Sequence, residues 1–346
     1  MAYTTINKSS LNMNTKLYNG SGSNQSLTGL GFKPDWIWGK TRSNAQRHVL
    51  TDVVRGINKQ LASDTTAAET SYTNSFTAFG SDGFSVGTDN GTNMASQTQV
   101  AWCWKAGTAV SGNSGGSGTA KSYSGSVNAT AGFSIIKYTG NGTSGHTIPH
   151  HLGSVPAMII FKQLNATRGW GVYHQSRGAG KIIYLDESIA EQSANILTGT
   201  PNSSVMSLPS LNENNINDAS YIAYCFAEKQ GYSKFGSYKG NGNADGAFVY
   251  TGFKPAFVMI KRSDGSASWE IRDNKRKPFP DGNGKRLFPD SGSAESSNSE
   301  VIEKLSNGFK IRSTGAGHNA NNGNYIYMAF AEAPLVGTNN VPCTAR

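Results

Sequence analysis

Three short apolar runs recur along the chain, each between a proline and a lysine six residues later. They are DWIWG between Pro34 and Lys40, AMIIF between Pro156 and Lys162, and AFVMI between Pro255 and Lys261. Runs of this length, bounded by turn residues, are typical of buried β-strands. Proline fits at the first position of a strand because its missing N–H does least harm there. Three copies of one pattern predict an internal repeat.

A second apolar pattern closes each copy and alternates large with small side chains. It reads VAWCW at 100–104, AYCFA at 223–227 and YMAFA at 327–331. Cys103 lies 69 residues after Pro34, and Cys225 lies 69 residues after Pro156. A period of two predicts a strand with two dry faces. We expect the large face to fill a sheet-to-sheet core and the small face to let a neighbouring layer approach closely.

These copies predict an all-β fold of three tandem β-sandwich-like repeats, lectin-like or jelly-roll-like, with little helix. Each copy spans about 90–100 residues, which is the size of one β-sandwich domain. The best helix candidate is SNSEVIEKL at 297–305, because capping and acidic residues stand at its start. The expected segments are an N-terminal docking segment (1–16), repeat 1 (17–107), a Gly/Ser-rich linker that can hold a β-segment (108–131), repeat 2 (132–231), repeat 3 (232–334) and a C-terminal tail (335–346).

Composition supports this fold and adds a positive charge. The chain has 346 residues, 41 of them glycine, and a formal net charge of +9. Glycine and asparagine supply the positive φ angles that tight β-turns need. The charge favours either solubility or attraction to an anionic partner, such as an envelope glycan or nucleic acid. Few aromatic residues interleave with the basic cluster at 272–286, and no helical or zinc framework accompanies it, which argues against specific nucleic-acid binding.

Candidate surface-recognition residues fall into two groups. Trp170 and Trp269 each follow a strand lysine by eight residues. They can form an aromatic platform for a glycan, but their repeated position favours a place in the core. The basic residues lie in a variable loop of the third copy, and loops on rigid scaffolds often carry binding functions. The full set is Trp170, Trp269, Arg272, Lys275, Arg276, Lys277, Lys285 and Arg286.

Signals for nucleotide or metal binding are weak. GKT at 39–41 ends like a phosphate-binding loop, but Pro34 stands where the first glycine belongs. His146, His150 and His151 cluster in a stretch with proline and glycine, which favours a loop over a zinc or nickel site. We therefore expect no cofactor and no metal.

Catalytic signals are equally weak. A glycosidase needs two carboxylates about 5–9 Å apart, and sequence spacing cannot pair the candidates in this chain. No G-x-S-x-G motif is present. We therefore expect no enzymatic activity. The candidate carboxylates are Asp52, Asp186, Glu187, Glu270 and Asp273.

The cysteines and the N-terminal residues indicate in which cellular compartment the chain is made. Three widely spaced cysteines are neither a disulfide framework nor a zinc site, and we expect Cys103 and Cys225 to be buried and inert. MAYTTINKSS at the N-terminus lacks the basic and apolar regions of a signal peptide. The longest apolar stretches are about seven residues, far short of a membrane span. We expect synthesis in a cytoplasm without a standard secretion signal.

Several motifs stand in a fixed order along the chain: MAYTTINKSS with NTKLY, SDGFSVG, AWCWKAG, GFSIIKYTGNGT and YCFAEKQGYSKFGSYKGNG. Together they resemble a repeat family that is widespread in tailed bacteriophages of marine bacteria. The resemblance covers the chain from residue 1 to about residue 334. The domain of that family is largely of unknown function, and its members are usually regarded as virion components encoded near tail-fibre genes. The resemblance implies a β-sandwich displayed on the particle surface.

On these grounds we expect a non-enzymatic bacteriophage virion protein, made in the host cytoplasm, that recognises a host-surface glycan as part of a tail fibre or similar appendage. Two alternatives stay open: a capsid decoration or head-fibre protein, and an envelope-polysaccharide depolymerase. The expected partners are other virion proteins and the host glycan. By analogy with phage fibres we also expect a homo-oligomer, for which a trimer fits although no heptad pattern supports one.

Overall fold

The computed structural model of the chain describes residues 4–276, 284–298, 301–332, 335–336 and 342–343. Nearly every element is a β-strand. In these ranges the helices are α1 (Asn90–Asn93), α2 (Ala316–Asn319) and the 3-10 helix η1 (Ser9–Leu11). The predicted all-β class with little helix is confirmed.

Three sheets carry the recurring apolar patterns, and in each of them four strands follow one another in the same order. The first sheet has β1 (Met13–Asn19), β9 (Thr98–Trp104), β3 (Trp36–Thr41) and β4 (Val49–Asp52). The second has β13 (Phe133–Thr139), β20 (Ser220–Ala227), β15 (Pro156–Gln163) and β16 (Gly171–His174). The third has β21 (Ser233–Lys239), β29 (Asn324–Ala331), β23 (Pro255–Arg262) and β24 (Glu270–Asp273). The two apolar strands of each copy are therefore antiparallel neighbours.

A smaller sheet packs on one face of each large sheet. Its strands are β2 (Gln25–Leu27), β8 (Gly83–Val86) and β7 (Phe76–Gly80) in the first case, β11 (Gly115–Gly116), β14 (His146–Pro149) and β19 (Val205–Leu208) in the second, and β22 (Phe248–Tyr250), β28 (Gly308–Arg312) and β27 (Val301–Leu305) in the third. We call the resulting two-sheet bodies the first unit (13–104), the second unit (108–227) and the third unit (233–331).

A further pair of short strands follows the fourth strand of each large sheet. The pairs are β5 (Lys59–Gln60) with β6 (Thr70–Ser71), β17 (Lys181–Tyr184) with β18 (Gln192–Ser193), and β25 (Gly284–Arg286) with β26 (Ser296–Asn298). The loops that accompany these pairs reach the neighbouring unit, as the contacts described below show.

The two faces of the closing strands have different partners. Cys103 in β9 packs in one cluster with Phe84 and Val86 of the outer sheet, and the small residues of β20 and β29 do the same in their own units. The large residues instead join one core shared by all three units. At its centre Trp104, Phe226 and Phe330 contact one another, with ring centroids 5.9–6.5 Å apart. The small face thus meets the second sheet of its own unit, and the large face meets the other units.

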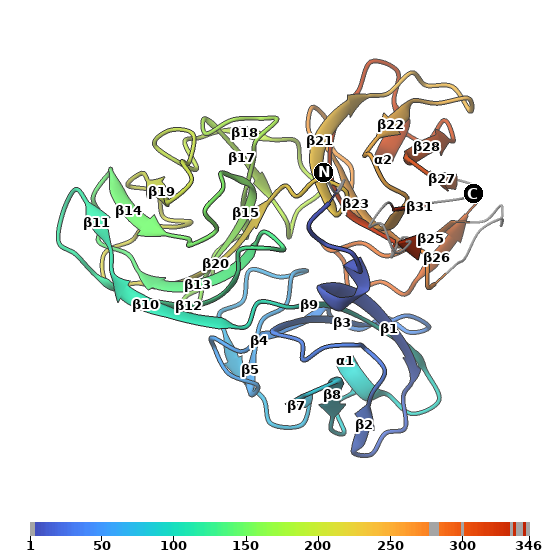
Figure 1. Cartoon of the computed structure of the whole chain (residues 1–346), viewed down its shortest axis with the longest axis horizontal. Coiled ribbons are helices and arrows are strands. Elements are labelled where there is room, and N and C mark those ends of the chain that lie inside the picture. The colour runs from blue at the N-terminus through green and yellow to red at the C-terminus, as the bar shows by residue number, and fades with distance from the viewer. Residues whose placement is uncertain (1–3, 277–283, 299–300, 333–334, 337–341, 344–346) are drawn as a thin grey trace.

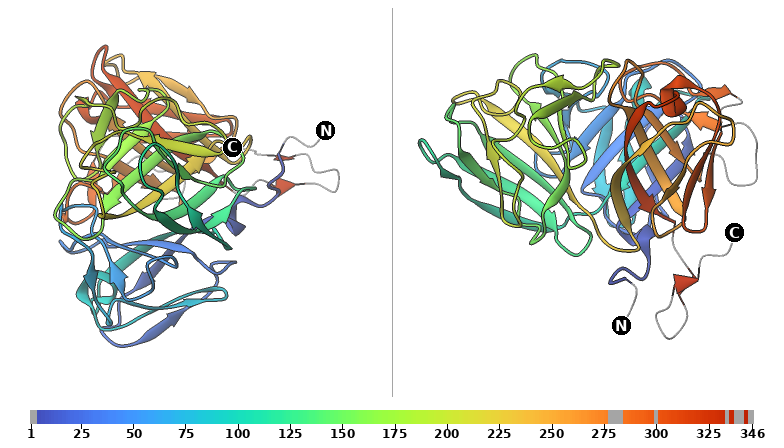
Figure 2. Two further views of the ribbon diagram at one scale, coloured as in Figure 1. Left: turned by 90° about the vertical axis from the view of Figure 1, so that its left-hand side faces the viewer. Right: turned by 90° about the horizontal axis from the view of Figure 1, so that it is seen from above.

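The three units surround this shared core as three lobes (Figure 1). In the left view of Figure 2 the second unit faces the viewer, with the third unit above it and the first unit below. Each unit therefore contacts both others. Burial of aromatic side chains at the centre stabilises this arrangement, because such rings remove the largest apolar areas from water.

The segment 108–131, predicted as a linker, is mostly folded. β10 (Thr108–Asn113) pairs with β12 (Ser122–Asn128), and β12 pairs with β13. β11 in the same segment pairs with β14 of the outer sheet. The linker prediction is therefore wrong over most of this segment, because its small residues extend both sheets of the second unit. The β-segment expected within it is present.

Two terminal predictions and one helix also need correction. Residues 13–16 of the predicted docking segment belong to β1, and Ile6 is buried in the shared core. The predicted helix at 297–305 is wrong: β26 ends at Asn298 and β27 pairs with β28, while 299–300 lie outside the described residues. In the predicted tail, β30 (Leu335–Val336) pairs with β31 (Pro342–Cys343), and its other residues lie outside the described ranges.

A Y-x-G-x-G motif opens each copy. Each of its two positions requires glycine, but for a different steric reason. A methyl group on Gly20 would lie 1.9 Å from Met94 O, and one on Gly140 would lie 2.3 Å from Ile216 O. Side-chain carbons do not come so close to a carbonyl oxygen, so the first glycine lets the turn pack on a second segment. The second glycine needs a left-handed backbone, as Gly142 shows with φ +71°.

Candidate functional site

The third strand in the order of each large sheet carries a buried lysine. The amine of this lysine binds a neighbouring unit. Lys40, Lys162 and Lys261 have fully buried side chains. Lys162 Nζ donates a hydrogen bond to Thr66 O of the first unit at 2.9 Å. Lys261 donates in the same way to a carbonyl of the second unit, and Lys40 to a carbonyl of the third. Burial lowers the pKa of each of these amines to about 8. We call the three contacts between units seams.

Trp170 and Trp269 lie in these seams and not on the surface. Their side chains are 0% and 1% exposed. Trp170 Nε1 donates to Ala62 O at 3.0 Å, and Trp269 Nε1 donates to Tyr184 O at 2.8 Å. His48 has the equivalent position in the first unit, where its Nε2 lies 2.9 Å from a carbonyl oxygen of the third unit. The core alternative is therefore the right one, and a surface glycan platform at these rings is excluded.

The seams run head to tail and return to their starting point. A loop of the first unit contacts the second unit, a loop of the second contacts the third, and a loop of the third contacts the first. The matching backbone hydrogen bonds are Glu69 N to Leu164 O, Glu191 N to Ser263 O and Glu295 N to Arg42 O, at 2.7–2.9 Å. A single chain thus forms a closed ring of three heterologous contacts. Its oligomeric state remains a prediction.

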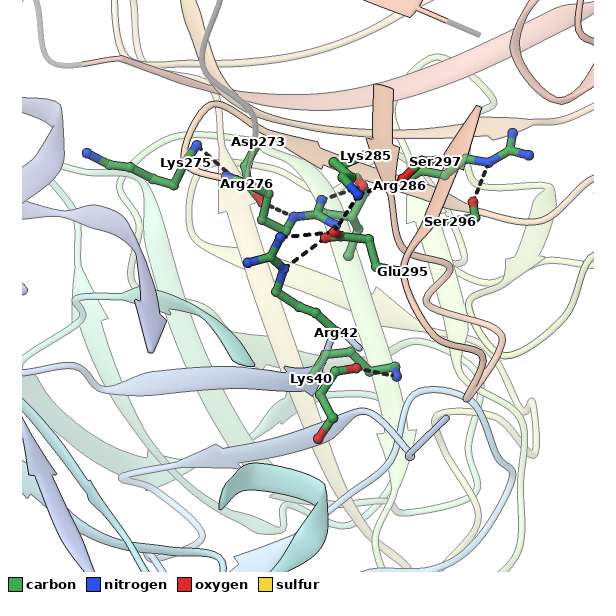
Figure 3. A network of polar contacts seen from close by, with 12 residues as sticks. Lys40, Arg42, Asp273, Lys275, Arg276, Lys285, Arg286, Glu295, Ser296 and Ser297 are labelled. Atoms are coloured by element: carbon green, nitrogen blue, oxygen red, sulfur yellow. Dashed lines mark hydrogen bonds and ion pairs between the residues drawn. The ribbon is translucent and has the colours of Figure 1, made fainter. Parts of the chain in front are cut away.

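The predicted basic cluster forms part of the seam between the third and first units (Figure 3). Arg276 donates to Asp273 at 2.6 Å and to Glu295 at 3.2 Å. Arg42 of the first unit binds Glu295 through two hydrogen bonds of 2.9 Å, and Lys285 Nζ lies 3.7 Å from the same carboxylate. Burial opposes the ionisation of Asp273, but Arg276 outweighs it and holds the pKa of Asp273 below its usual range.

The remaining cluster residues divide between a second ion network and the surface. Arg272 and Arg286 bind Glu270 at 2.9 and 3.0 Å. Burial opposes the ionisation of Glu270, yet the neighbouring cations outweigh it and hold the pKa of this carboxyl well below its usual range. Lys275 is exposed, and Lys277 lies outside the described residues. The prediction of an anion-binding surface cluster is therefore wrong for most of its described members, because carboxylates of the same unit bind them.

Asp52 and two of the histidine candidates also have structural partners. Asp52 binds Arg55 at 2.5 Å and accepts a hydrogen bond from Tyr224 of the second unit at 2.8 Å. His146 and His150 are buried and bind an asparagine side chain and a backbone carbonyl, respectively. In the described ranges no group of three or more His, Cys, Asp or Glu side chains is arranged to hold a metal ion.

Cys103 and Cys225 are buried and free of disulfides, as expected. Burial raises the pKa of both thiols, which keeps them protonated and unreactive near neutral pH.

A cleft of about 430 Å³ in the first unit is the best candidate site that the sequence did not indicate. Its size is within the range of small-ligand sites. Val49 and Leu61 are buried apolar residues in its lining, and Tyr72 stands at the cleft with 45% of its side chain exposed. The polar lining residues are Gln46, Arg47, Gln60, Thr70, Tyr72 and Asp89.

Four of these polar side chains are free of hydrogen bonds among the described residues, although the charge of Arg47 acts on Asp64. Across the part of the chain that the structure describes, the side chains of Gln46, Arg47, Gln60 and Tyr72 make no hydrogen bond and no ion pair. The basic residues of the third unit differ in this respect, because most of them are committed to carboxylates. Donors, acceptors and an aromatic ring are therefore available to a ligand in the cleft.

Two seams position the walls of this cleft. Ala62 belongs to the lining, and its carbonyl oxygen accepts the hydrogen bond from Trp170 of the second unit. The backbone N–H of Gln46 donates to Gly292 O of the third unit at 2.9 Å. These contacts fix the backbone of the walls, so little backbone entropy is lost when a ligand binds. Sequence reasoning missed the cleft because its residues come from separate loops and form no motif.

Fold and site together define an all-β protein of three sandwich-like units around one aromatic core, with an open cleft in the first unit. The chain belongs to the family described as "Domain of unknown function (DUF7483)", whose model matches residues 8–334 in one span. No curated protein and no solved structure matches the chain. Among the described residues, no helix combines the length and apolar character needed to cross a bilayer.

Proposed function

We propose that the protein is a virion surface protein that binds a host-surface glycan through the first-unit cleft without cleaving it. One observation carries this proposal: an exposed tyrosine ring stands in a cleft beside polar side chains that make no hydrogen bond or ion pair with another described residue. Sugars present an apolar face that stacks on aromatic rings, and hydroxyl groups that both donate and accept hydrogen bonds. Arg47, Gln46 and Gln60 supply donors, and the two glutamines also supply acceptors.

The cleft favours binding over hydrolysis. Most glycosidases use two carboxyl groups that flank the scissile bond. Asp89 is the one carboxylate among the residues that line this cleft. The candidate carboxylates Asp52, Glu270 and Asp273 are held by arginines at or near the seams. These contacts support a binding role and give no support to the depolymerase alternative.

Placement on a virion rests on the resemblance of the sequence motifs to the phage repeat family. A tail fibre or similar appendage suits a glycan-binding protein, because it meets the host surface first. Gold-labelled antibody against the chain on intact particles would test this placement. Label at the tail supports it, whereas label confined to the head would favour a capsid decoration or head-fibre protein.

Tyr72→Ala and Arg47→Ala should each weaken glycan binding about tenfold, because each removes a central contact worth about 1–2 kcal/mol. The measurement is binding of the full chain to an array of bacterial surface polysaccharides. Lys275→Ala is the matched control for Arg47→Ala. Both side chains are exposed cations without an ion pair among the described residues, but only Arg47 lines the cleft.

Equal binding by the wild type and both cleft variants would refute the cleft as the site. Weaker binding by Lys275→Ala alone would restore the basic-loop prediction. Release of new reducing ends from a bound polysaccharide would replace the binding proposal by the depolymerase alternative.

A further inference from the structure

The third unit presents two exposed aromatic side chains on one short strand. Phe248 and Tyr250 of β22 are 46% and 61% exposed, whereas Val249 between them is buried. Residues two apart on a strand share a face and their Cα atoms lie about 7 Å apart, so the two rings stand on the same side of β22. Among the described residues β22 pairs with β28 alone and forms the edge of its sheet.

The equivalent strands of the other units show that the fold does not require these rings. The outward residue of β2 in the first unit is Ser26, which pairs with Ser85. In the second unit Thr147 of β14 pairs with Ser207. The same scaffold therefore forms with small hydroxyl side chains at the place of Phe248. An exposed aromatic pair that neither folding nor packing needs points to a ligand.

The neighbouring strand keeps the rings accessible. Gly308 of β28 lies opposite Tyr250, and a methyl group on this glycine would lie 3.1 Å from Cε2 of Phe248. The Phe248 ring thus lies against Gly308. Because the glycine has no side chain, nothing on β28 at this position rises above the rings.

A balanced set of charged groups borders the rings. Lys310 lies directly opposite Phe248, and directly paired residues share one face of a sheet. Asp245 binds Lys310 at 2.7 Å and Arg312 at 2.8 Å, and Arg312 also binds Glu303 at 2.9 Å. Two carboxylates and two cations leave no net charge. The surface therefore suits an uncharged ligand with many hydroxyl groups better than a polyanion.

We propose that Phe248 and Tyr250, with Asp245, Lys310 and Arg312 beside them, form a second binding site for an uncharged carbohydrate. The rings stack on the apolar faces of adjacent sugar residues, and the charged side chains bind hydroxyl groups. The inference rests on the proposed glycan-binding function and adds a contact on a different unit from the cleft. One polysaccharide that reaches both sites would bind with an avidity above that of either site.

The test is affinity electrophoresis of the full chain in gels that contain dextran, yeast mannan or laminarin, three uncharged polysaccharides. The wild type should be retarded in at least one gel, and the variant with both Phe248→Ser and Tyr250→Ala should lose at least tenfold in affinity there. Phe248→Tyr keeps both rings and should retain the retardation. Equal thermal midpoints of the variants would show that a lost ring, and not lost folding, causes the effect.

Tyr72→Ala in the same gels separates this inference from the proposed function. If the double variant has the mobility of the wild type and Tyr72→Ala migrates faster, the second site is refuted and the cleft is supported. The reverse result supports the second site, and the array result then decides on the cleft. Absence of retardation in every gel refutes the second site, while the array result decides on the cleft independently. Concentration-dependent dimers that disappear in the double variant would overturn the inference, because a second copy would then cover the edge of β22.

Discussion

At the scale of single residues, the same side chains that suggest binding in the sequence are used to join units. The tryptophans and lysines of the repeat recur because each seam needs the same two donors, one indole or imidazole N–H and one amine. Their burial was predictable from their repetition. The fate of the basic cluster was not, although Asp273 and Arg276 stand three residues apart, the spacing that Asp52 and Arg55 also have. Sequence alone does not show that such pairs are buried together.

Because of the buried lysines, the free energy of unfolding should change with pH in the alkaline range. Burial disfavours the charged amine, so this penalty is fully present below pH 8 and fades as the pH rises towards 10.5, the ordinary lysine value. Lys162→Met removes the titrating group. The free energy of unfolding of the wild type, relative to this variant, should therefore rise by about 1 kcal/mol per pH unit between pH 8 and 9.5.

Urea unfolding at pH 7, 8, 9 and 9.5 measures this difference. Lys181→Met is the control, because the amine of Lys181 binds Ser193 at the surface. The rise for Lys162→Met should exceed any change for this control over the same range. A constant difference for Lys162→Met would contradict the lowered pKa of Lys162.

At the scale of elements, strands were predictable wherever alternation or proline-initiated apolar runs marked them. The exception is 297–305, where acidic residues near the start imitate a helix. Pairing of β27 with β28 overrides that local preference, since it buries Ile302 and satisfies backbone groups of both strands. The segment 108–131 was misjudged for the opposite reason. Its small polar residues lack a strand pattern, but existing sheet edges supply the hydrogen-bond partners.

The opening turns give a prediction at this scale. Gly140→Ala should lower the free energy of unfolding by about 1–3 kcal/mol, because the added methyl group would lie 2.3 Å from Ile216 O and the backbone must move. Gly199→Ala is the matched control, since no atom lies within 4 Å of a methyl group at that position. Chemical unfolding of both variants measures the difference, and equal stabilities would show that the turn tolerates a side chain.

At the scale of the whole molecule, the ring could not be predicted from sequence. Most acceptors in the seams are backbone carbonyls, such as Thr66 O and Ala62 O, and these carry no residue signature. The repeat predicts similar units, but it does not predict how they face one another. The cleft could not be predicted from sequence either, because contacts between units bring its walls together.

A closed ring also predicts that the covalent link between the second and third units is dispensable. The exposed turn at Gln230 is the place to divide the chain into fragments 1–230 and 231–346. Co-expressed fragments should purify together and unfold in one transition, because both seams of the third unit and the shared aromatic core remain. Size-exclusion chromatography with calorimetry tests this. Fragments that elute separately would show that the seams are too weak to hold the ring.

The head-to-tail seams also set how such a chain can grow. Three seams close the ring, so each unit already uses both of the surfaces that join it to its neighbours. A fourth unit would find no free partner surfaces and would force every crossing angle to change. Enlargement is therefore confined to the outer rim, and the strands added by residues 108–131 are an enlargement of this kind: they widen one lobe while the stoichiometry of the circle stays at three.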